Sequence, residues 1–350
     1  MPDEEKESIA FDDRAPTRDG PRAFSAEQLI ACEECLRANP PTRMRCLYCG
    51  APLPSTEATE THRRPTLRPL EEWERGFNVV LLPRGAEEVS AESFAEASRL
   101  LRTEREKLQE IVRANCALPL ARAASDEEAD LIRKRLGALG FGVEIFQDEM
   151  LSPTGAPPKR IRALELTGEA LSGWANVGEA SHSIDWPNIA LVVAGRIYTR
   201  RVELEERQGR FKARGEIAEA RELAVDQAVL DIHAFDGDTD DVWRIMADNF
   251  DYSCLGEHKT LLARDNFVTL AEALRGRASA GAFDDDYARL RHLLAVAWPP
   301  DERKESHGLR RERPGRFNTE AVTTISNEMQ FTRYSRLRAL LRRRELSNNT

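Results

Sequence analysis

Four of the six cysteines in this 350-residue chain lie within eighteen positions, and their spacing constrains the local fold more than any other feature. The segment CEECLRANPPTRMRCLYCGAP holds two Cys-x-x-Cys pairs separated by ten residues, formed by Cys32, Cys35, Cys46 and Cys49. Each pair can aim two thiolates at one ion about 2.3 Å away, and two pairs complete a tetrahedron. So short a segment buries little surface, so a bound metal would supply its folding free energy.

We therefore predict one structural Zn²⁺ held by these four thiolates. Four protein ligands leave no open coordination position, which favours a structural over a catalytic metal. Two disulfides, or four free thiols, stay open as alternatives. The acidic N-terminus MPDEEKESIAFDDRAP lacks the apolar segment of a signal peptide, so we expect a cytoplasmic protein in which thiols stay reduced. No apolar run approaches the roughly 20 residues that cross a bilayer, so we expect no membrane contact.

The residues around the cysteines resemble two related families. NPP at 39–41 and CGAPL at 49–53 are similar to bacterial zinc ribbons, and this resemblance implies a zinc ribbon over residues 26–54. Asn39 also falls at the asparagine position of the RanBP2-type finger, while Ile30 stands where that family has tryptophan.

The finger resemblance implies that arginines of this segment contact RNA. The candidates are Arg37, Arg43 and Arg45. Arginines at such positions also commonly do no more than face water, and that alternative stays open.

Residues 76–148 are predicted to form a second domain with the element order β-α-α-(β)-α-β. FNVVL (77–81) and EEADLIRKRLGALGFGVEI (127–145) resemble the first strand and the last helix and strand of the C-terminal domain of the bacterial ribosomal stalk protein. The resemblance covers about a fifth of the chain and implies a compact α/β fold. The stalk family contacts translational GTPases through a Gly- and Lys-rich helix junction. RTEREKLQEIVRAN (102–115) stands there without a glycine, so we carry over the fold alone.

Residues 161–300 show several strand-like runs followed by helical patterns, which predicts a mixed α+β domain. A small β-barrel closed by a helix, of pleckstrin-homology type, is one arrangement that would suit this order. The chain is thus expected to be an α+β multidomain protein. Its connecting parts are a disordered acidic N-terminus at 1–25 and linkers at 55–75 and 149–160.

Charge is distributed unevenly along the chain. The net charge is −9, which argues against a protein that coats nucleic acid with its whole surface. Residues 301–350 carry twelve Lys/Arg against seven Asp/Glu, a local +5, so the rest carries −14. This predicts a basic tail that ends in an amphipathic helix at 330–346. Its candidate contacts to RNA or to an acidic partner are Arg338, Arg342 and Arg343.

No recognised catalytic motif occurs: HExxH, GxSxG, GxxxxGK[ST] and GxGxxG are all missing, and the six histidines are scattered. We therefore favour a zinc-binding adaptor or scaffold without catalytic activity, whose protein partners the sequence does not name. The alternative is a ribosome- or RNA-associated factor that uses the ribbon and the basic tail. An enzyme whose site lies within 160–300 also stays open, although nothing there indicates a reaction.

Overall fold

The computed structural model describes residues 24–71, 74–83, 89–152, 157–176, 180–209, 216–236, 239–278, 281–313 and 316–348. The chain divides into two compact units, Met1–Arg64 and Pro65–Thr350. Most of the acidic segment predicted to be disordered, 1–25, lies outside the described residues. No helix in the described ranges is long and apolar enough to cross a membrane.

The first unit is small and has little regular structure. Its elements are η1 (Ala26–Gln28), β1 (Ile30–Ala31), β2 (Ala38–Asn39) and α1 (Glu57–Glu60). Strands β1 and β2 pair antiparallel, with Ile30 opposite Asn39. The buried apolar cluster of this unit consists of Cys32, Cys46 and Leu53, with Cys35 and Ala51 packed against it. Cysteine side chains therefore form most of the core, as expected for a fold that depends on metal.

The second unit begins with the predicted element order. Its elements are β3 (Phe77–Leu81), α2 (Ala91–Leu101), α3 (Arg105–Arg113), β4 (Leu118–Ala123), α4 (Asp126–Ala138) and β5 (Val143–Gln147). Strand β3 lies in the middle of a three-stranded sheet and pairs antiparallel with both β4 and β5. Ser90 caps α2, because its side chain accepts the N–H of Ser93.

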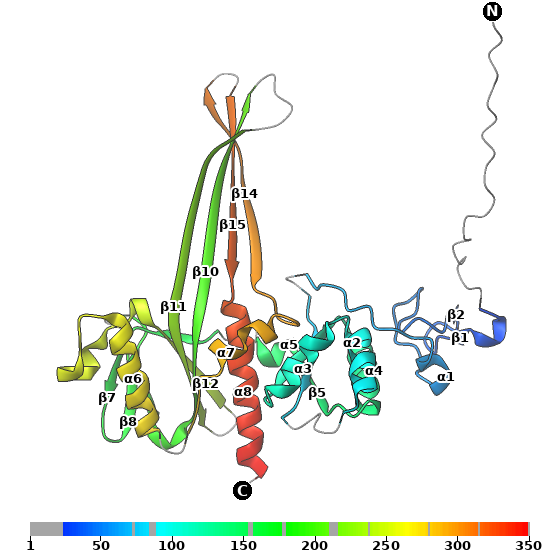
Figure 1. Cartoon of the computed structure of the whole chain (residues 1–350), viewed down its shortest axis with the longest axis horizontal. Coiled ribbons are helices and arrows are strands. Elements are labelled where there is room, and N and C mark those ends of the chain that lie inside the picture. The colour runs from blue at the N-terminus through cyan, green and yellow to red at the C-terminus, as the bar shows by residue number, and fades with distance from the viewer. Residues whose placement is uncertain are drawn as a thin grey trace, which may run out of the picture. The chain divides into compact units, whose positions relative to one another are not determined.

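The rest of this unit is built on a seven-stranded sheet in the order β14-β15-β10-β11-β12-β6, with β13 paired to β10 (Figure 1). The strands are β6 (Lys159–Ile161), β10 (Ile189–Gly209), β11 (Glu216–Asp236), β12 (Thr239–Met246), β13 (Ala282–Asp284), β14 (Asp301–Arg313) and β15 (Arg316–Ser326). A second sheet contains β7 (Ala163–Leu166), β8 (Ala170–Trp174) and β9 (His182–Asp185).

The mixed α+β class is confirmed. The strand path of the described residues ends at β14 and β6, unlike a closed barrel.

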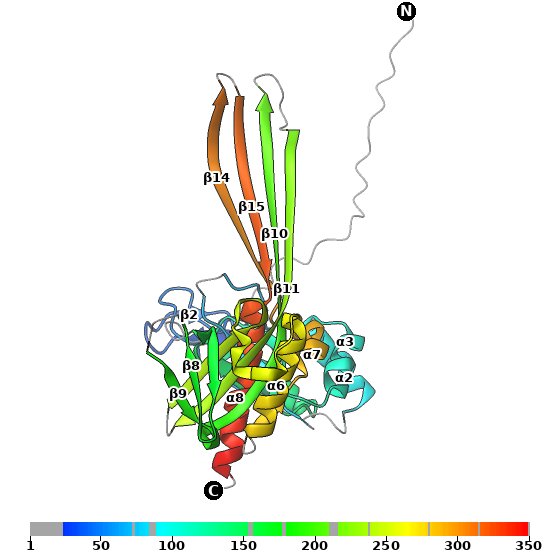
Figure 2. The same cartoon turned by 90° about the vertical axis from the view of Figure 1, so that its left-hand side faces the viewer.

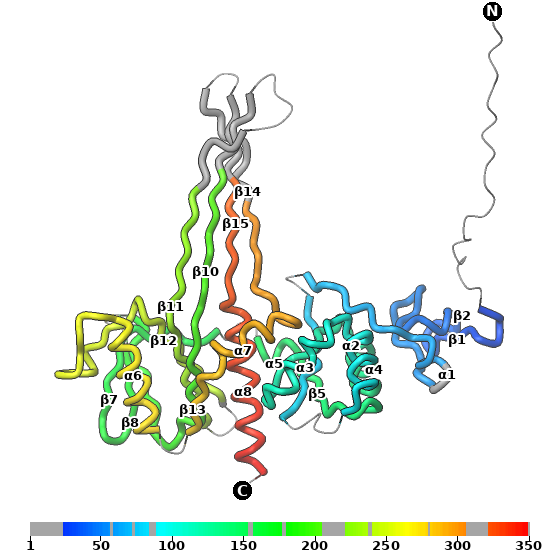
Figure 3. Tube along the Cα trace, in the orientation of Figure 1, coloured from blue at the N-terminus to red at the C-terminus, as the bar shows by residue number. Residues whose placement is uncertain are grey.

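Helices accompany these sheets. They are α5 (Asp148–Leu151), α6 (Ala263–Arg277), α7 (Tyr287–Leu294) and α8 (Glu328–Asn348), with short 3-10 turns η2 (Trp186–Asn188), η3 (Ala247–Asn249) and η4 (Tyr252–His258). Helix α8 packs along β10 and contacts α5 and α7. It runs from the base of the long strands in the direction opposite to them (Figure 3).

Four strands of the large sheet extend away from the rest of the second unit as an arm (Figures 1 and 2). β10 and β11 each have 21 residues, well beyond the usual 3–10. β12 pairs with β11 over Val229–Asp236, and among the described residues the part of β11 before Val229 has no partner on that side and forms an edge of the arm. On the other side, β15 pairs with β10 from Thr199 to Gly209, and β14 continues the sheet outward. The arm is thus a single antiparallel layer.

Residues 301–350 do not form the separate basic tail that the sequence suggested. Strands β14 and β15 join the large sheet, and the predicted amphipathic helix is present as α8. Its apolar face is buried: Phe331, Tyr334 and Leu337 are almost inaccessible. The tail prediction failed because β14 and β15 are rich in charged and polar residues. Such strands show little of the apolar alternation that marks a half-buried strand.

The predicted linker at 55–75 is anchored along part of its length. Thr66 N and Leu67 N donate to Glu128 Oε1 at 2.6 and 2.9 Å, and the Thr66 hydroxyl donates to the same oxygen at 2.8 Å. Glu128 is 2% exposed and belongs to α4. Residues 65–71 therefore belong to the second unit.

The predicted boundary at 149–160 does not separate two cores. Buried residues of β3, such as Val79, belong to the same apolar cluster as Val193 of β10 and Phe331 of α8. The residues predicted as domains 76–148 and 161–300 therefore share a core within the second unit.

Candidate metal centre

The four predicted cysteine ligands meet in the first unit. Their Sγ atoms all lie within 4.8 Å of one another. Cys32 and Cys49 are 3.6 Å apart at sulfur, as are Cys35 and Cys46. A tetrahedral ion with metal–sulfur bonds of about 2.3 Å has sulfur–sulfur edges of about 3.8 Å. A disulfide would need about 2.05 Å, and all four cysteines are free. The cluster is therefore shaped to hold a metal ion.

Two equivalent turns bring the thiols together. In the first knuckle, residues 32–37, Leu36 N donates to Cys32 O at 2.8 Å and Cys32 N donates to Arg37 O at 3.0 Å. In the second knuckle, residues 46–51, Gly50 N donates to Cys46 O at 3.1 Å and Cys46 N donates to Ala51 O at 2.8 Å.

A left-handed residue follows the second cysteine of each knuckle. Leu36 has φ of 58° and Gly50 has φ of 75°. Glycine takes this conformation freely, whereas leucine pays about 1 kcal/mol or more for it. The first knuckle therefore keeps a leucine at a position where its backbone conformation favours glycine.

Asn39 connects the knuckles from inside the unit. It is fully buried, and its Nδ2 donates to Arg37 O at 2.9 Å and to Cys46 Sγ at 3.4 Å. Its Oδ1 accepts the N–H of Leu47 at 2.9 Å. Burial acts to raise the pKa of the Cys46 thiol. The backbone N–H groups of Cys49 and Tyr48 and the Asn39 amide outweigh that effect and lower the pKa to about 6. The site thus favours a thiolate at Cys46, the form that binds metal.

Three large apolar side chains lie exposed on the two knuckles. Leu36 is 81% exposed, Leu47 52% and Tyr48 57%. We call these three residues the knuckle surface. The guanidinium of Arg37 stacks over the Tyr48 ring, 4.7 Å from its centroid. These three apolar residues were not among the predicted contact residues. Their positions could have indicated their exposure. Each lies directly after or between cysteines whose side chains point to the centre of the site, so the neighbouring side chains point toward solvent.

The predicted arginine contacts fall in two different units. In the first unit, Arg37 rests on Tyr48, and Arg43 and Arg45 are exposed. In the second unit, Arg338 Nε lies 2.5 Å from Asp284 Oδ2.

The other two candidates on α8 also have contacts within the second unit. Arg342 pairs with Glu345 at 3.2 Å, and the guanidinium of Arg343 lies over the Phe235 ring at 4.3 Å. The helix arginines thus contact the protein itself.

The comparisons add no family assignment. No protein-family model, curated protein or solved structure matches this chain.

Proposed function

We propose that this chain is a zinc-dependent adaptor whose first unit binds a protein partner through the knuckle surface. The observation that carries the proposal is the exposure of Leu36, Leu47 and Tyr48 on a unit with almost no apolar core of its own. The zinc ribbon would hold the surface in shape, and the larger second unit would be the scaffold attached to it.

Zinc suits the donor set best among the common biological metals. Four thiolates at tetrahedral spacing are the ligands of structural zinc sites, and they leave no coordination position for a substrate. The role of the metal would therefore be to stabilise the fold rather than to react.

The knuckle surface has the properties of a binding site. Apolar and aromatic side chains are the usual anchors of protein interfaces, and arginine often accompanies them. The two turns and the buried Asn39 hold the backbone beneath these side chains, so binding would order few additional groups. Arg37 beside Tyr48 would favour a partner with an acidic group next to its apolar patch.

The test compares capture of cellular proteins by the wild-type chain and by a Leu36→Ala/Leu47→Ala variant. A matched control replaces two exposed leucines of the second unit, Leu261→Ala/Leu262→Ala. We expect a defined set of proteins to be lost with the knuckle variant and kept with the control, at equal zinc content. Retention of the same proteins by the knuckle variant would overturn the proposal.

A nucleic-acid partner would give a different result. Ribonuclease treatment would then release the captured material, and Arg37→Gln/Arg43→Gln would weaken RNA binding with a reduced salt dependence. That outcome would replace the protein-binding proposal with the RNA-associated alternative.

A further inference from the structure

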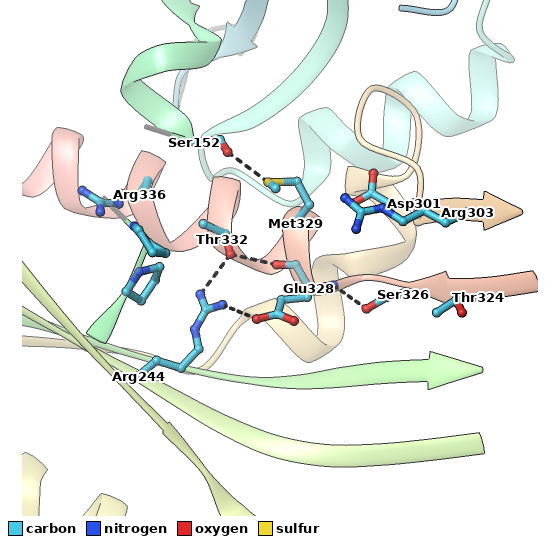
Figure 4. Close-up of a pocket in the computed structure, with 12 residues that line it drawn as sticks. Ser152, Arg244, Asp301, Arg303, Thr324, Ser326, Glu328, Met329, Thr332 and Arg336 are labelled. Carbon is cyan, nitrogen blue, oxygen red and sulfur yellow. Dashed lines mark hydrogen bonds and ion pairs between the residues drawn. The ribbon is translucent and has the colours of Figure 1, made fainter. Parts of the chain in front are cut away.

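A cavity of about 450 Å³ lies at the base of the arm, where β15 ends and α8 begins (Figure 4). This volume falls in the range of small-molecule sites. Its lining comes from distant parts of the chain, including the end of α5, β12, β14, β15 and the first turns of α8. Three arginines, two carboxylates and several hydroxyls line the cavity. The arginines are Arg244, Arg303 and Arg336.

Arg244 is the fixed part of the cavity wall. It is 2% exposed, and Asp231 holds its Nε and Nη2 at 2.7 and 2.8 Å. Nη2 also donates to the Thr332 hydroxyl at 3.0 Å. These bonds neutralise the buried charge and fix the guanidinium plane. Its remaining terminal nitrogen, Nη1, is therefore presented in a set direction.

A carboxylate of the chain itself occupies that direction. Arg244 Nη1 donates to Glu328 Oε1 at 3.2 Å, and Arg160 Nη2 donates to the same oxygen at 2.8 Å (Figure 4 shows the first contact). Glu328 is 39% exposed and Arg160 is 61% exposed. The pair of Glu328 with Arg160 is exposed and contributes little, about 0–1 kcal/mol, and Asp231 still neutralises the buried Arg244 when the Glu328 side chain turns toward water.

We propose that this cavity binds a small anionic molecule whose phosphate or carboxylate group replaces the Glu328 carboxylate on Arg244. The chain already places a carboxylate oxygen at this position, so the site has the geometry to hold one. Thr324 and Ser326 add hydroxyl groups to the lining, and Arg303 adds a second guanidinium. A ligand with several acceptor oxygens can use these groups together, which the single Glu328 side chain does not do.

In this arrangement the Glu328 carboxylate competes with the ligand for Arg244. Removing its charge should therefore strengthen binding of an anion, and the experiment measures that change. Pyrophosphate and malonate serve as phosphate and carboxylate probes in calorimetric titrations of the full chain at fixed ionic strength. Glu328→Gln removes the competing charge but keeps the side-chain shape. The matched control is Glu345→Gln, which removes the same charge from the same helix where it pairs with Arg342.

We expect Glu328→Gln to bind at least one probe about tenfold more tightly than wild type, since a charged hydrogen-bond competitor is removed. Glu345→Gln should bind as wild type does. Arg303→Gln, on β14 and outside the helix, should weaken binding severalfold, and circular dichroism should show each variant folded.

Two results would overturn the proposal. One is equal gain in Glu328→Gln and Glu345→Gln, which would show a general effect of net charge. The other is no saturable binding of either probe below about 10 mM in wild type and in Glu328→Gln. Tighter binding of pyrophosphate than of malonate would assign the site to phosphates, and the reverse would assign it to carboxylates. Either order supports the proposed anion site.

Discussion

The indole N–H of Trp298 donates to Asn78 Oδ1 at 2.7 Å, which joins residues 220 positions apart in the sequence. Asn78 lies on β3, and both residues are fully buried. Asn78 Nδ2 in turn donates to Asp148 Oδ1 at 2.9 Å and to Phe146 O at 3.0 Å. Strand β3 and the end of β5 are therefore tied to the segment that precedes the arm strand β14.

The same chain of hydrogen bonds continues to the base of the arm. Gln330 Nε2 donates to the carbonyl of Trp298 at 2.6 Å, and Tyr287 donates its hydroxyl to Gln330 Oε1 at 2.9 Å. Asn327 Nδ2 donates to the Tyr287 oxygen at 2.9 Å, and Asn327 Oδ1 accepts the N–H of Tyr198 at 2.6 Å. Each buried polar group in this series thus has a partner, so the series can stabilise the junction.

Asn78→Ala should destabilise the second unit by about 2–4 kcal/mol. The change leaves the buried indole N–H of Trp298 without its acceptor and removes one donor from Asp148, and unsatisfied buried groups cost about 1–3 kcal/mol each. Urea unfolding followed by tryptophan fluorescence measures the loss. Asn249→Ala, at an exposed asparagine, should stay within about 0.5 kcal/mol of wild type. Equal stability of the two variants would contradict the structural role of this contact.

Glu128→Gln should lower stability at neutral pH and lose its effect in acid. Burial acts to raise the pKa of Glu128, but the Leu67 N–H, the Thr66 hydroxyl and other donors outweigh it, so the folded-state pKa is lowered. A carboxylate whose pKa is lowered by folding stabilises above its unfolded pKa of about 4.3, and this contribution disappears as pH falls through the folded pKa. The expected loss at pH 7 is about 1–3 kcal/mol.

Urea unfolding of Glu128→Gln at pH 7 and at decreasing pH measures this difference. Asp126→Asn is the matched control because it removes an exposed carboxylate from the same first turn of α4. A difference between Glu128→Gln and wild type that stays constant into strong acid would contradict the assigned ionisation. So would an equal effect of the control.

The cysteine site was predictable because its signal is local. Two Cys-x-x-Cys pairs indicate the four candidate ligands from spacing alone. Asn39 was notable because it falls at the asparagine position of the RanBP2-type finger, and in the structure it bonds to both knuckles. The first elements of the second unit were also predictable. Each of their helices has an apolar stripe with the helical period, and this signal is contained in the local sequence. At the start of α4, Ser125 and Glu128 have the spacing of a capping box, and the Ser125 side chain accepts the N–H of Glu128. The Glu128 side chain instead accepts from Ala124 N and from the Thr66 hydroxyl.

The arm and the anion cavity were not predictable from local pattern. The ends of β10 and β15 pair across a separation of more than one hundred residues, as Gly209 with Arg316 shows. The cavity depends on that pairing, because it lies between the start of α8 and the arm strands. Charged residues of α8 looked free in the sequence. Only the fold brings Arg338 to Asp284 and Arg344 to Glu144.

Cys46→Ser should remove the metal and unfold the first unit alone. The core of that unit consists largely of the ligand cysteines, so little remains to hold it without metal. Elemental analysis should find about one zinc per wild-type chain and little in the variant. Limited proteolysis should then cut within residues 24–64, while the unfolding midpoint of the second unit stays unchanged. Cys254→Ser, outside the cluster, should keep its zinc. Less than about half an equivalent of zinc in wild type would contradict the site.

Gly195→Ala tests how closely the base of the arm packs on α8. A Cβ at Gly195 of β10 would lie 2.4 Å from Phe331 Cε2 and 2.9 Å from Tyr287 Cδ1, both on fully buried rings. Neither ring has room to move aside, so the expected loss is about 1–3 kcal/mol or more in urea unfolding. Gly137→Ala in α4 meets nothing within 4 Å and should instead gain about 0.5–1 kcal/mol, the helix preference of alanine over glycine.

A second substitution separates this clash from any effect of alanine on the strand itself. Phe331→Leu removes the atoms nearest the new Cβ, so the double variant should recover part of the stability lost in Gly195→Ala after the cost of Phe331→Leu alone is subtracted. The coupling free energy should be about 0.5–3 kcal/mol and favourable. If the two losses simply add, the arm base does not pack on α8 as described, because residues without contact show no coupling.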